Sequence, residues 1–273
     1  MKNKVIVVLT GPSCSGKSFL SQHLMKSGSF GEAVSTTTRA PRSGEQDGVH
    51  YHFVDNEAFE QKKANNEFIE TIEFSSKKYG ITANEFEKLF DKGLTPLVVA
   101  EPNGAEQISN YCAKAGWSPI CLFINVPTKV AVERFVERFV ADYSAKPDAL
   151  VLREYSRRLA LAVQVESSWG RMLKYDHVFP ISDTVERAAS IASEIKSEVS
   201  KIHNGAGSEW LKDAGNKKLT NFPAVPQESQ ELYINVFANT LLSNYGKEPS
   251  EISLEILRAI NREQKNELRG IEC

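Results

Sequence analysis

One segment near the start of the chain restricts its fold more than any other. Residues 11–18 read Gly-Pro-Ser-Cys-Ser-Gly-Lys-Ser and fit the pattern GxxxxGK(S/T). An apolar run from Lys4 to Leu9 precedes this segment, and apolar residues at helical spacing follow from Lys17 to Lys26. A strand, a glycine-rich turn and a helix in this order form a cradle whose backbone N–H groups bind phosphate oxygens. We therefore predict a phosphate-binding loop within an α/β fold.

Each fixed position of this loop has a physical task. Gly11 and Gly16 let the backbone turn its N–H groups inward, and the following helix adds the positive end of its dipole. Lys17 is expected to reach the outer phosphates, and Ser18 to offer its hydroxyl to Mg²⁺. Cys14 is interpreted as a small spacer, because no base is identifiable for it. The predicted nucleotide-binding residues are Gly11, Ser13, Ser15, Gly16, Lys17 and Ser18.

The composition is that of an ordinary globular protein. Of the 273 residues, 41% are hydrophobic and 25% are charged, and the formal net charge is −2. This charge argues against binding nucleic acid through bulk electrostatics, so an anion site must be local. The four cysteines show no metal-ligand spacing, which favours reduced thiols and a cytoplasmic location. The sequence shows neither a signal peptide nor a long apolar span, and we expect no membrane partner.

The pattern along the chain extends the α/β interpretation. Apolar runs at Leu97–Ala100 and Ile120–Val126 are typical of central strands in a parallel sheet covered by helices. Further strands are expected at Val49–Val54, as two short strands near Phe68–Phe74, and at Val178–Ile181. Helices are expected at Asn56–Ala64, Thr128–Phe139, Leu150–Trp169 and Thr184–Ile202.

A separate segment is expected after this core. His203–Ser208 reads as the start of a linker, and Gln227–Ser243 and Ser250–Leu268 read as two amphipathic helices. We expect these helices to dock on the core or to join two copies of the chain. The predicted division is a core domain at 1–202, a linker at 203–226 and a helical extension at 227–273.

A longer block beyond the loop resembles guanylate kinases. Residues 35–42 read Ser-Thr-Thr-Thr-Arg-Ala-Pro-Arg, and the similarity continues through Gly44, Glu45, Asp47, Gly48, Tyr51, Phe53, residues 66–70 and Tyr79-Gly80. The resemblance implies an α/β, three-layer P-loop kinase fold with a parallel central sheet. It also implies a small mixed β subdomain at about 35–95, which binds the nucleoside monophosphate, and a helical lid at about 134–160. ATP and Mg²⁺ are the implied cofactors, nucleotides the implied partners, and phosphorylation of GMP, dGMP or a related monophosphate the implied reaction.

The resemblance also assigns roles to residues that would bind the acceptor. Residues matching Ser35 and Glu70 contact the guanine edge in the family, and the residue matching Tyr79 contacts the acceptor phosphate. Arg39 and Arg42 each offer a guanidinium group that can donate two parallel hydrogen bonds to a phosphate, and Tyr51 offers a phenol group to the same phosphate. The predicted acceptor-binding residues are Ser35, Arg39, Arg42, Tyr51, Glu70, Tyr79 and Thr82.

Arginines of the implied lid complete the predicted site. Arg134, Arg138 and Arg158 resemble family arginines that fold over the two nucleotides and stabilise charge on the moving phosphoryl group. Together with Lys17 they form the predicted catalytic set. Three nearby arginines either are spare members of this set or pair with acidic residues on helix faces. They are Arg153, Arg157 and Arg171, with Glu133, Glu137 or Glu166 as partners.

Two positions depart from the family pattern. The family places a hydroxyl beside the guanine where this chain has Ile81, and an acidic residue where it has Val99. Thr82 is the candidate for restoring the hydroxyl. Each lost buried polar partner costs about 1–3 kcal/mol, so weaker or altered guanine discrimination is expected. Glu101 stands at the second acidic position and, with Ser18, forms the predicted magnesium-binding pair.

Two other functions remain open from the sequence. One is a kinase acting on another phosphorylated acceptor such as ribose bisphosphate, because such kinases resemble guanylate kinases without the full base pocket. The residues that speak against it are Arg39, Arg42, Tyr51 and Glu70. The other is a guanylate-kinase-like module that binds a protein and transfers no phosphate. The intact Gly16, Lys17 and Ser18 speak against that function.

Overall fold

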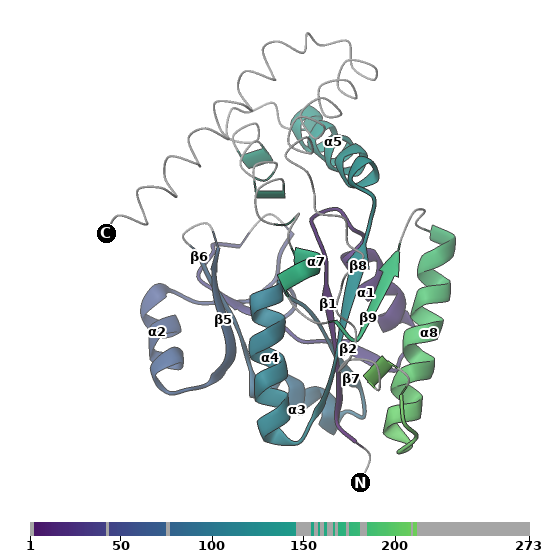
Figure 1. Cartoon of the computed structure of the whole chain (residues 1–273). Coiled ribbons are helices and arrows are strands. Elements are labelled where there is room, and N and C mark those ends of the chain that lie inside the picture. Colours follow the sequence, from purple (N-terminus) through teal and green to yellow (C-terminus); the bar gives the residue numbers. More distant parts are fainter. Residues whose placement is uncertain are drawn as a thin grey trace.

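The computed structural model describes two sheets with their surrounding helices (Figure 1). The described residues are 3–41, 44–74, 77–145, 154–155, 158, 161–162, 166, 169–172, 175–180, 185–208 and 210–211. The helices are α1 (Lys17–Lys26), α2 (Asn56–Ala64), α3 (Ala83–Asp91), α4 (Pro102–Ala115), α5 (Thr128–Ala145), α7 (Trp169–Met172) and α8 (Val185–His203). No helix in these ranges is both long enough and apolar enough to cross a membrane.

The larger sheet has five parallel strands in the order β2-β7-β1-β8-β9. Parallel strands require crossover connections, which the chain supplies as helices. The predicted α/β fold with a parallel central sheet is therefore confirmed. The strands are β1 (Val5–Thr10), β2 (Phe30–Glu32), β7 (Thr95–Val99), β8 (Ser118–Asn125) and β9 (His177–Pro180).

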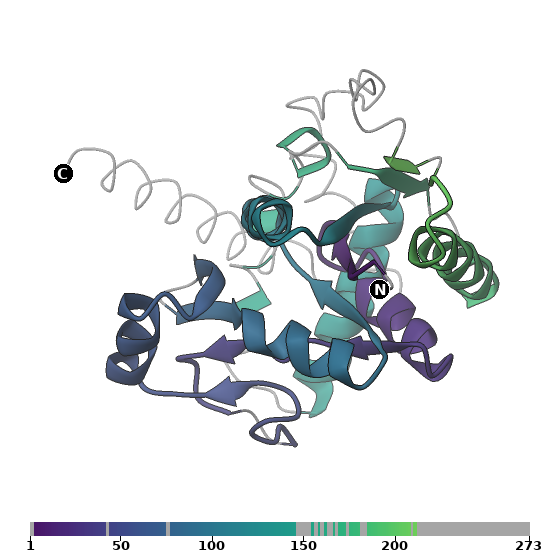
Figure 2. The same cartoon turned by 90° about the horizontal axis from the view of Figure 1, so that it is seen from below.

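Alternate side chains of β1 enter the two apolar clusters on either side of this sheet. Val5, Val7 and Leu9 pack in the cluster that includes α1 and α8, whereas Ile6 and Val8 pack in the cluster that includes α3 and α4. Figure 2 shows α4 and α8 on opposite sides of the sheet. The central strand is therefore buried on both faces, which explains its uninterrupted apolar sequence.

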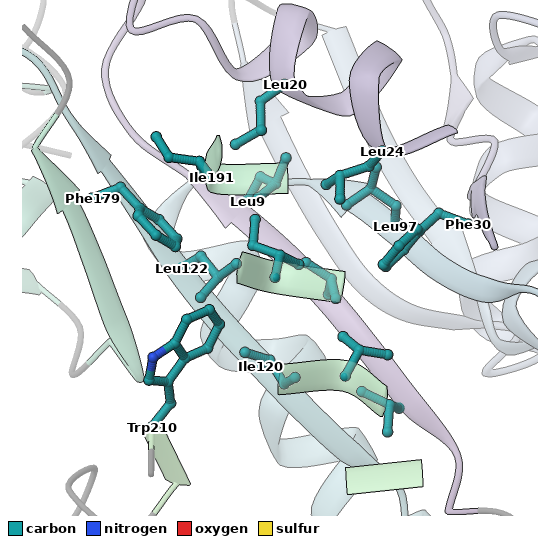
Figure 3. Close-up of a cluster of buried hydrophobic side chains, with 14 of the residues drawn as sticks. Leu9, Leu20, Leu24, Phe30, Leu97, Ile120, Leu122, Phe179, Ile191 and Trp210 are labelled. Carbon is teal, nitrogen blue, oxygen red and sulfur yellow. The ribbon is translucent and has the colours of Figure 1, made fainter. Parts of the chain in front are cut away.

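The first cluster places Trp210 against the sheet. Figure 3 shows its indole beside Leu122 and Phe179, and its side chain is 7% exposed. The indole also stacks on His177, with 4.6 Å between ring centroids. Packing on the core therefore extends past residue 202, where the sequence suggested that the domain ends. The predicted helical extension at 227–273 lies outside the described residues.

Truncation of a side chain in this cluster should destabilise the protein strongly. Leu122 is fully buried on β8, so Leu122→Ala is expected to lower the free energy of unfolding by about 2–5 kcal/mol. Leu211, at 36% exposure, is the matched control, and Leu211→Ala should change that energy by only about 0.5 kcal/mol. Urea denaturation of both variants checks this prediction. Equal destabilisation would contradict the assigned core.

The smaller sheet is mixed and has the strand order β4-β3-β6-β5. β3 pairs parallel with β4 and antiparallel with β6, and β5 pairs antiparallel with β6. Its strands are β3 (Thr36–Thr37), β4 (His52–Phe53), β5 (Phe68–Phe74) and β6 (Lys77–Thr82). Figure 1 shows this sheet, with α2, beside the larger one.

Three predictions from the sequence need correction here. The strand expected at Val49–Val54 is reduced to His52–Phe53, because residues 48–50 form a turn closed by hydrogen bonds to Gln46 and Tyr51. Phe68–Phe74 is one strand rather than two, since all of its pairing is with β6. The helix expected at Thr128–Phe139 runs on to Ala145 as α5. Most of the helix predicted at Leu150–Trp169 lies outside the described residues.

Candidate functional site

The glycine-rich loop joins the end of β1 to the start of α1, as its sequence predicted. Gly11 has a positive φ, and a Cβ there would lie 2.6 Å from the carbonyl oxygen of Ile124. Gly16 caps α1 in the left-handed conformation, with φ of 93°. The Ser15 N–H donates to the Pro12 carbonyl at 3.1 Å and closes the turn. Both glycines are therefore required by the backbone path.

Lys17 folds back over this loop. Its Nζ donates to the carbonyl oxygens of Gly11 at 2.6 Å and Pro12 at 2.8 Å. The pKa of Lys17 is lowered to about 8, mainly by burial and also by the charge of Arg138, whereas the charge of Glu166 raises it. The ammonium group is thus held at the loop by two neutral carbonyl oxygens. A bound phosphate would replace them as a charged partner of this group.

Glu166 occupies the same cradle from another part of the chain. Its carboxylate accepts a hydrogen bond from the Ser13 backbone N–H at 2.6 Å and another from the Ser13 hydroxyl at 2.9 Å. From the sequence, Glu166 was one of three candidate partners for an arginine on a helix face, and the structure places its carboxylate on the loop. Arg153 and Arg157, two of the proposed partners, lie outside the described residues.

A first cavity of about 370 Å³ lies over the loop. Its wall includes three cationic side chains, those of Arg134, Arg138 and Arg158, in addition to Lys17. Arg134 also donates from Nη1 to the Cys14 carbonyl at 3.2 Å. Loop N–H groups and four cations around one cavity make it suited to a polyphosphate. The remaining lining residues are Ser13, Cys14, Ser15, Gly16, Ser18, Phe19, Leu20, Phe135 and Ala188.

A second cavity of about 490 Å³ lies beside the mixed sheet and the end of β7. Arg158 lines this cavity as well as the first one. One guanidinium group is therefore shared by both cavities, and its Nε lies 3.4 Å from Glu154 Oε1. The predicted residues in this wall are Ser35, Arg39, Tyr51, Glu70, Tyr79, Glu101 and Arg158.

Two predicted residues are not among those that line this cavity. Arg42 lies outside the described residues. Thr82 ends β6 and serves as the N-cap residue of α3, whereas its neighbour Ile81 is buried and lines the cavity. The structure therefore gives no support for Thr82 as a replacement for the missing hydroxyl.

Arg39 is held by several neighbouring side chains. Its two terminal nitrogens pair with the carboxylate oxygens of Glu45 at 2.9 and 2.8 Å. The guanidinium carbon also lies 5.2 Å from the ring centre of Tyr51. The side-chain hydrogen bond to Glu45 raises the pKa of Arg39, and a hydrogen bond to Tyr79 adds to it. This cluster presents a preorganised cation with a fork-shaped face.

Glu70 lies deep in the second cavity, on β5, next to a shift of register between Phe68 and Glu70. Its side chain is 6% exposed. A Cβ at Gly104 would lie 2.8 Å from Glu70 Oε1, so the start of α4 leaves room for this carboxyl group only because residue 104 is glycine. Burial raises the pKa of Glu70 to about 7, helped by the charge of Glu101, while a hydrogen bond from Ile81 lowers it.

The raised pKa predicts how stability depends on pH. The folded protein keeps a proton on Glu70 that the unfolded chain releases between pH 4.5 and about 7. Stability should therefore fall as pH rises through that window, by about 3 kcal/mol from this group. Glu70→Gln should remove this contribution, whereas Glu73→Gln, at an exposed position of the same strand, should keep it. Urea denaturation at several pH values measures both, and parallel curves for Glu70→Gln and the parent protein would contradict the prediction.

Reasoning from sequence missed three contributors to this site. Glu166 bonds Ser13 although 153 positions separate them, and no local pattern connects the two. Glu45 belongs to the quoted block but was given no task, although its charge next to Arg39 suggested a pair. For Gly104, the sequence offers only one indication, a glycine inside a helix, which often marks a close approach of another group.

Several known proteins are similar to this chain. Residues 3–149, just over half of it, match the family model described as guanylate kinase. A guanylate kinase of Clostridium perfringens is 32% identical over 150 residues, which are 55% of this chain and 66% of that protein. One of Clostridium tetani is 30% identical over 203 residues, 74% of this chain and 91% of that protein. The crystal structure of guanylate kinase from Anaplasma phagocytophilum matches with a TM-score of 0.52 and 25% identity, covering 80% of this chain and 97% of that one.

Proposed function

Because the chain belongs to the guanylate kinase family, we propose that it transfers a phosphoryl group from ATP to a nucleoside monophosphate. GMP, dGMP or a closely related monophosphate is the proposed acceptor. The observation that carries this proposal is the position of Arg158, which lines both the cavity over the phosphate loop and the cavity beside the mixed sheet. Two adjoining anion sites with a shared cation suit transfer between two bound phosphates.

Each group of residues has a task in this reaction. The loop N–H groups and Lys17 hold the ATP phosphates, and Arg39 with Tyr51 and Tyr79 holds the acceptor phosphate. Arg158, with Arg134 and Arg138 on α5, stabilises the charge of the moving group. Catalysis then consists of positioning and charge stabilisation, without a covalent intermediate on the protein. Residues 35–95 act as the monophosphate-binding part, and 134–160 as the lid.

The residues present fit a magnesium ion bound together with the nucleotide. Burial, then the charge of Glu166, raises the pKa of Glu101, and a cation bound beside this carboxylate would lower it. Ser18, at the start of α1, lines the first cavity. These two side chains would hold the ion, which would neutralise charge between the transferring and leaving groups. Nucleotide-bound Mg²⁺ takes only one or two protein groups, so the site needs no cluster of three acidic, histidine or cysteine side chains, and none occurs among the described residues.

The second cavity fits a purine edge less completely than the family pattern implies. Ser35 and Glu70 offer polar groups to a base, whereas Ile81 and Val99 present apolar surface to the same cavity. An ionised Glu70 accepts hydrogen bonds from a ring N–H and an exocyclic amine, as guanine offers. Guanine is therefore the proposed base. Discrimination against other bases should be weaker than in a pocket with polar side chains at all four of these positions.

A panel of acceptors tests the proposal. ADP release from ATP is measured with GMP, dGMP, AMP, CMP and UMP, and with ribose phosphates, in the presence of Mg²⁺. We expect turnover with at least one nucleoside monophosphate and a preference for the guanine forms. Turnover only with ribose phosphates would replace the nucleotide by a sugar phosphate as acceptor. No turnover with any of these compounds would reject the proposed reaction.

A further inference from the structure

A protein carboxylate is bound to the phosphate loop at Ser13, a residue that lines the first cavity. Glu166 receives two hydrogen bonds from Ser13, one from the backbone N–H and one from the hydroxyl. The Glu166 side chain is buried, with 8% exposure. Its charge raises the pKa of Lys17 and of Glu101, so it lies within electrostatic reach of both. An anion thus already sits among the groups that the proposed function assigns to ATP.

This arrangement sets two anions in competition for the same donors. A backbone N–H has one hydrogen, and at 2.6 Å the one of Ser13 is fully used by Glu166. A phosphate oxygen bound by this N–H and a carboxylate at the same place would also repel each other. Binding of a polyphosphate across the loop therefore requires the Glu166 side chain to leave.

We propose that Glu166 is an internal competitor of the ATP phosphates and thereby sets the affinity of the donor site. A fraction of the protein has the cradle filled by its own carboxylate, and the observed dissociation constant rises as the open fraction falls. Anions with few contacts, such as inorganic phosphate, are then excluded, whereas a polyphosphate with many contacts displaces the carboxylate. The inference rests on the proposed function only in treating the loop as the donor site.

Removal of the carboxylate should tighten polyphosphate binding. We expect Glu166→Ala to lower the dissociation constants of ADP and of inorganic tripolyphosphate by about tenfold, as the loss of a charged hydrogen-bonded competitor implies. Glu166→Gln keeps the size of the side chain and should give a smaller gain. Isothermal titration calorimetry on the full chain measures both. Glu106→Ala, at an exposed position of α4, is the matched control and should change nothing.

High salt tests whether the gain comes only from long-range repulsion through solvent between like charges. Repulsion through solvent is largely screened at about 0.5 M salt, whereas occupation of the Ser13 N–H is not. The gain of Glu166→Ala relative to the parent protein should therefore persist at high salt. The nuclear magnetic resonance signal of the Ser13 amide should also shift in Glu166→Ala without any ligand, because its hydrogen-bond partner is gone.

The possible failures point to different conclusions. Equal affinities in parent and variants, weaker binding in Glu166→Ala, or a gain that disappears at high salt would overturn the inference and leave the proposed function standing. Absence of ADP and tripolyphosphate binding in all of these proteins would overturn the proposed donor site, and the inference with it. A melting curve of each variant shows that the comparison is made between folded proteins.

Discussion

Replacement of Lys17 by alanine is expected to reduce kcat about a hundredfold to a thousandfold. Lys17 donates hydrogen bonds to the loop carbonyls of Gly11 and Pro12, and a bound polyphosphate would take their place as its partner. Loss of one preorganised donor to a developing charge typically has an effect of this size. Steady-state ADP release with saturating acceptor measures it.

The effect should be specific to this position. Lys26, at the other end of α1, is exposed, and Lys26→Ala should leave kcat unchanged. Circular dichroism and thermal melting of Lys17→Ala should show a folded protein, because the substitution removes the hydrogen bonds of a single loop side chain and leaves the apolar core intact. A folded Lys17→Ala variant with the turnover of the parent protein would contradict the assignment of the loop.

The second large effect is expected at Arg39. Arg39→Lys keeps the positive charge but loses the planar guanidinium group, whose two terminal nitrogens donate hydrogen bonds to Glu45. A lysine can offer neither this pairing nor two parallel hydrogen bonds to a phosphate. The KM for the acceptor should therefore rise about a hundredfold, the loss expected for one or two hydrogen bonds between charged groups. The KM for ATP should stay unchanged.

Initial rates at varied acceptor and at varied ATP measure this difference. Arg187→Lys is the matched control, because Arg187 is exposed on α8, and neither KM should change in it. An equal rise of both KM values would mean that Arg39 supports the fold rather than the acceptor. An unchanged acceptor KM would remove Arg39 from the site.

The parts of the structure that follow local rules were predictable from sequence. The loop at residues 11–18 combines a fixed motif with a strand before it and a helix after it, and the structure has both. The bounds of α2 agree with the prediction because Asp55 caps the helix, its side chain accepting from the Ala58 N–H at 2.8 Å. Both β7 and β8 were located by apolar runs, with ends that differ by one or two residues.

The parts that were missed depend on distant partners. β3 has two residues, Thr36 and Thr37, and exists only through pairing with β4 and β6, which no local pattern shows. Neither α3 nor α4 was predicted, and α4 contains Gly104, a residue that lowers helix propensity but leaves room for Glu70. The contact of Glu166 with the loop likewise joins two distant segments. Tertiary packing decides such features.

Transfer of a labelled phosphoryl group tests the central claim most directly. The protein is incubated with Mg²⁺, GMP and ATP that carries a radioactive γ-phosphate, in a single turnover, and the nucleotides are separated. The proposed arrangement of two adjoining phosphate sites predicts that the label appears in GDP, and that Lys17→Ala and Arg39→Lys slow its appearance. Label that stays in ATP, or that is released only as inorganic phosphate with GMP and with every other monophosphate, would contradict the claim.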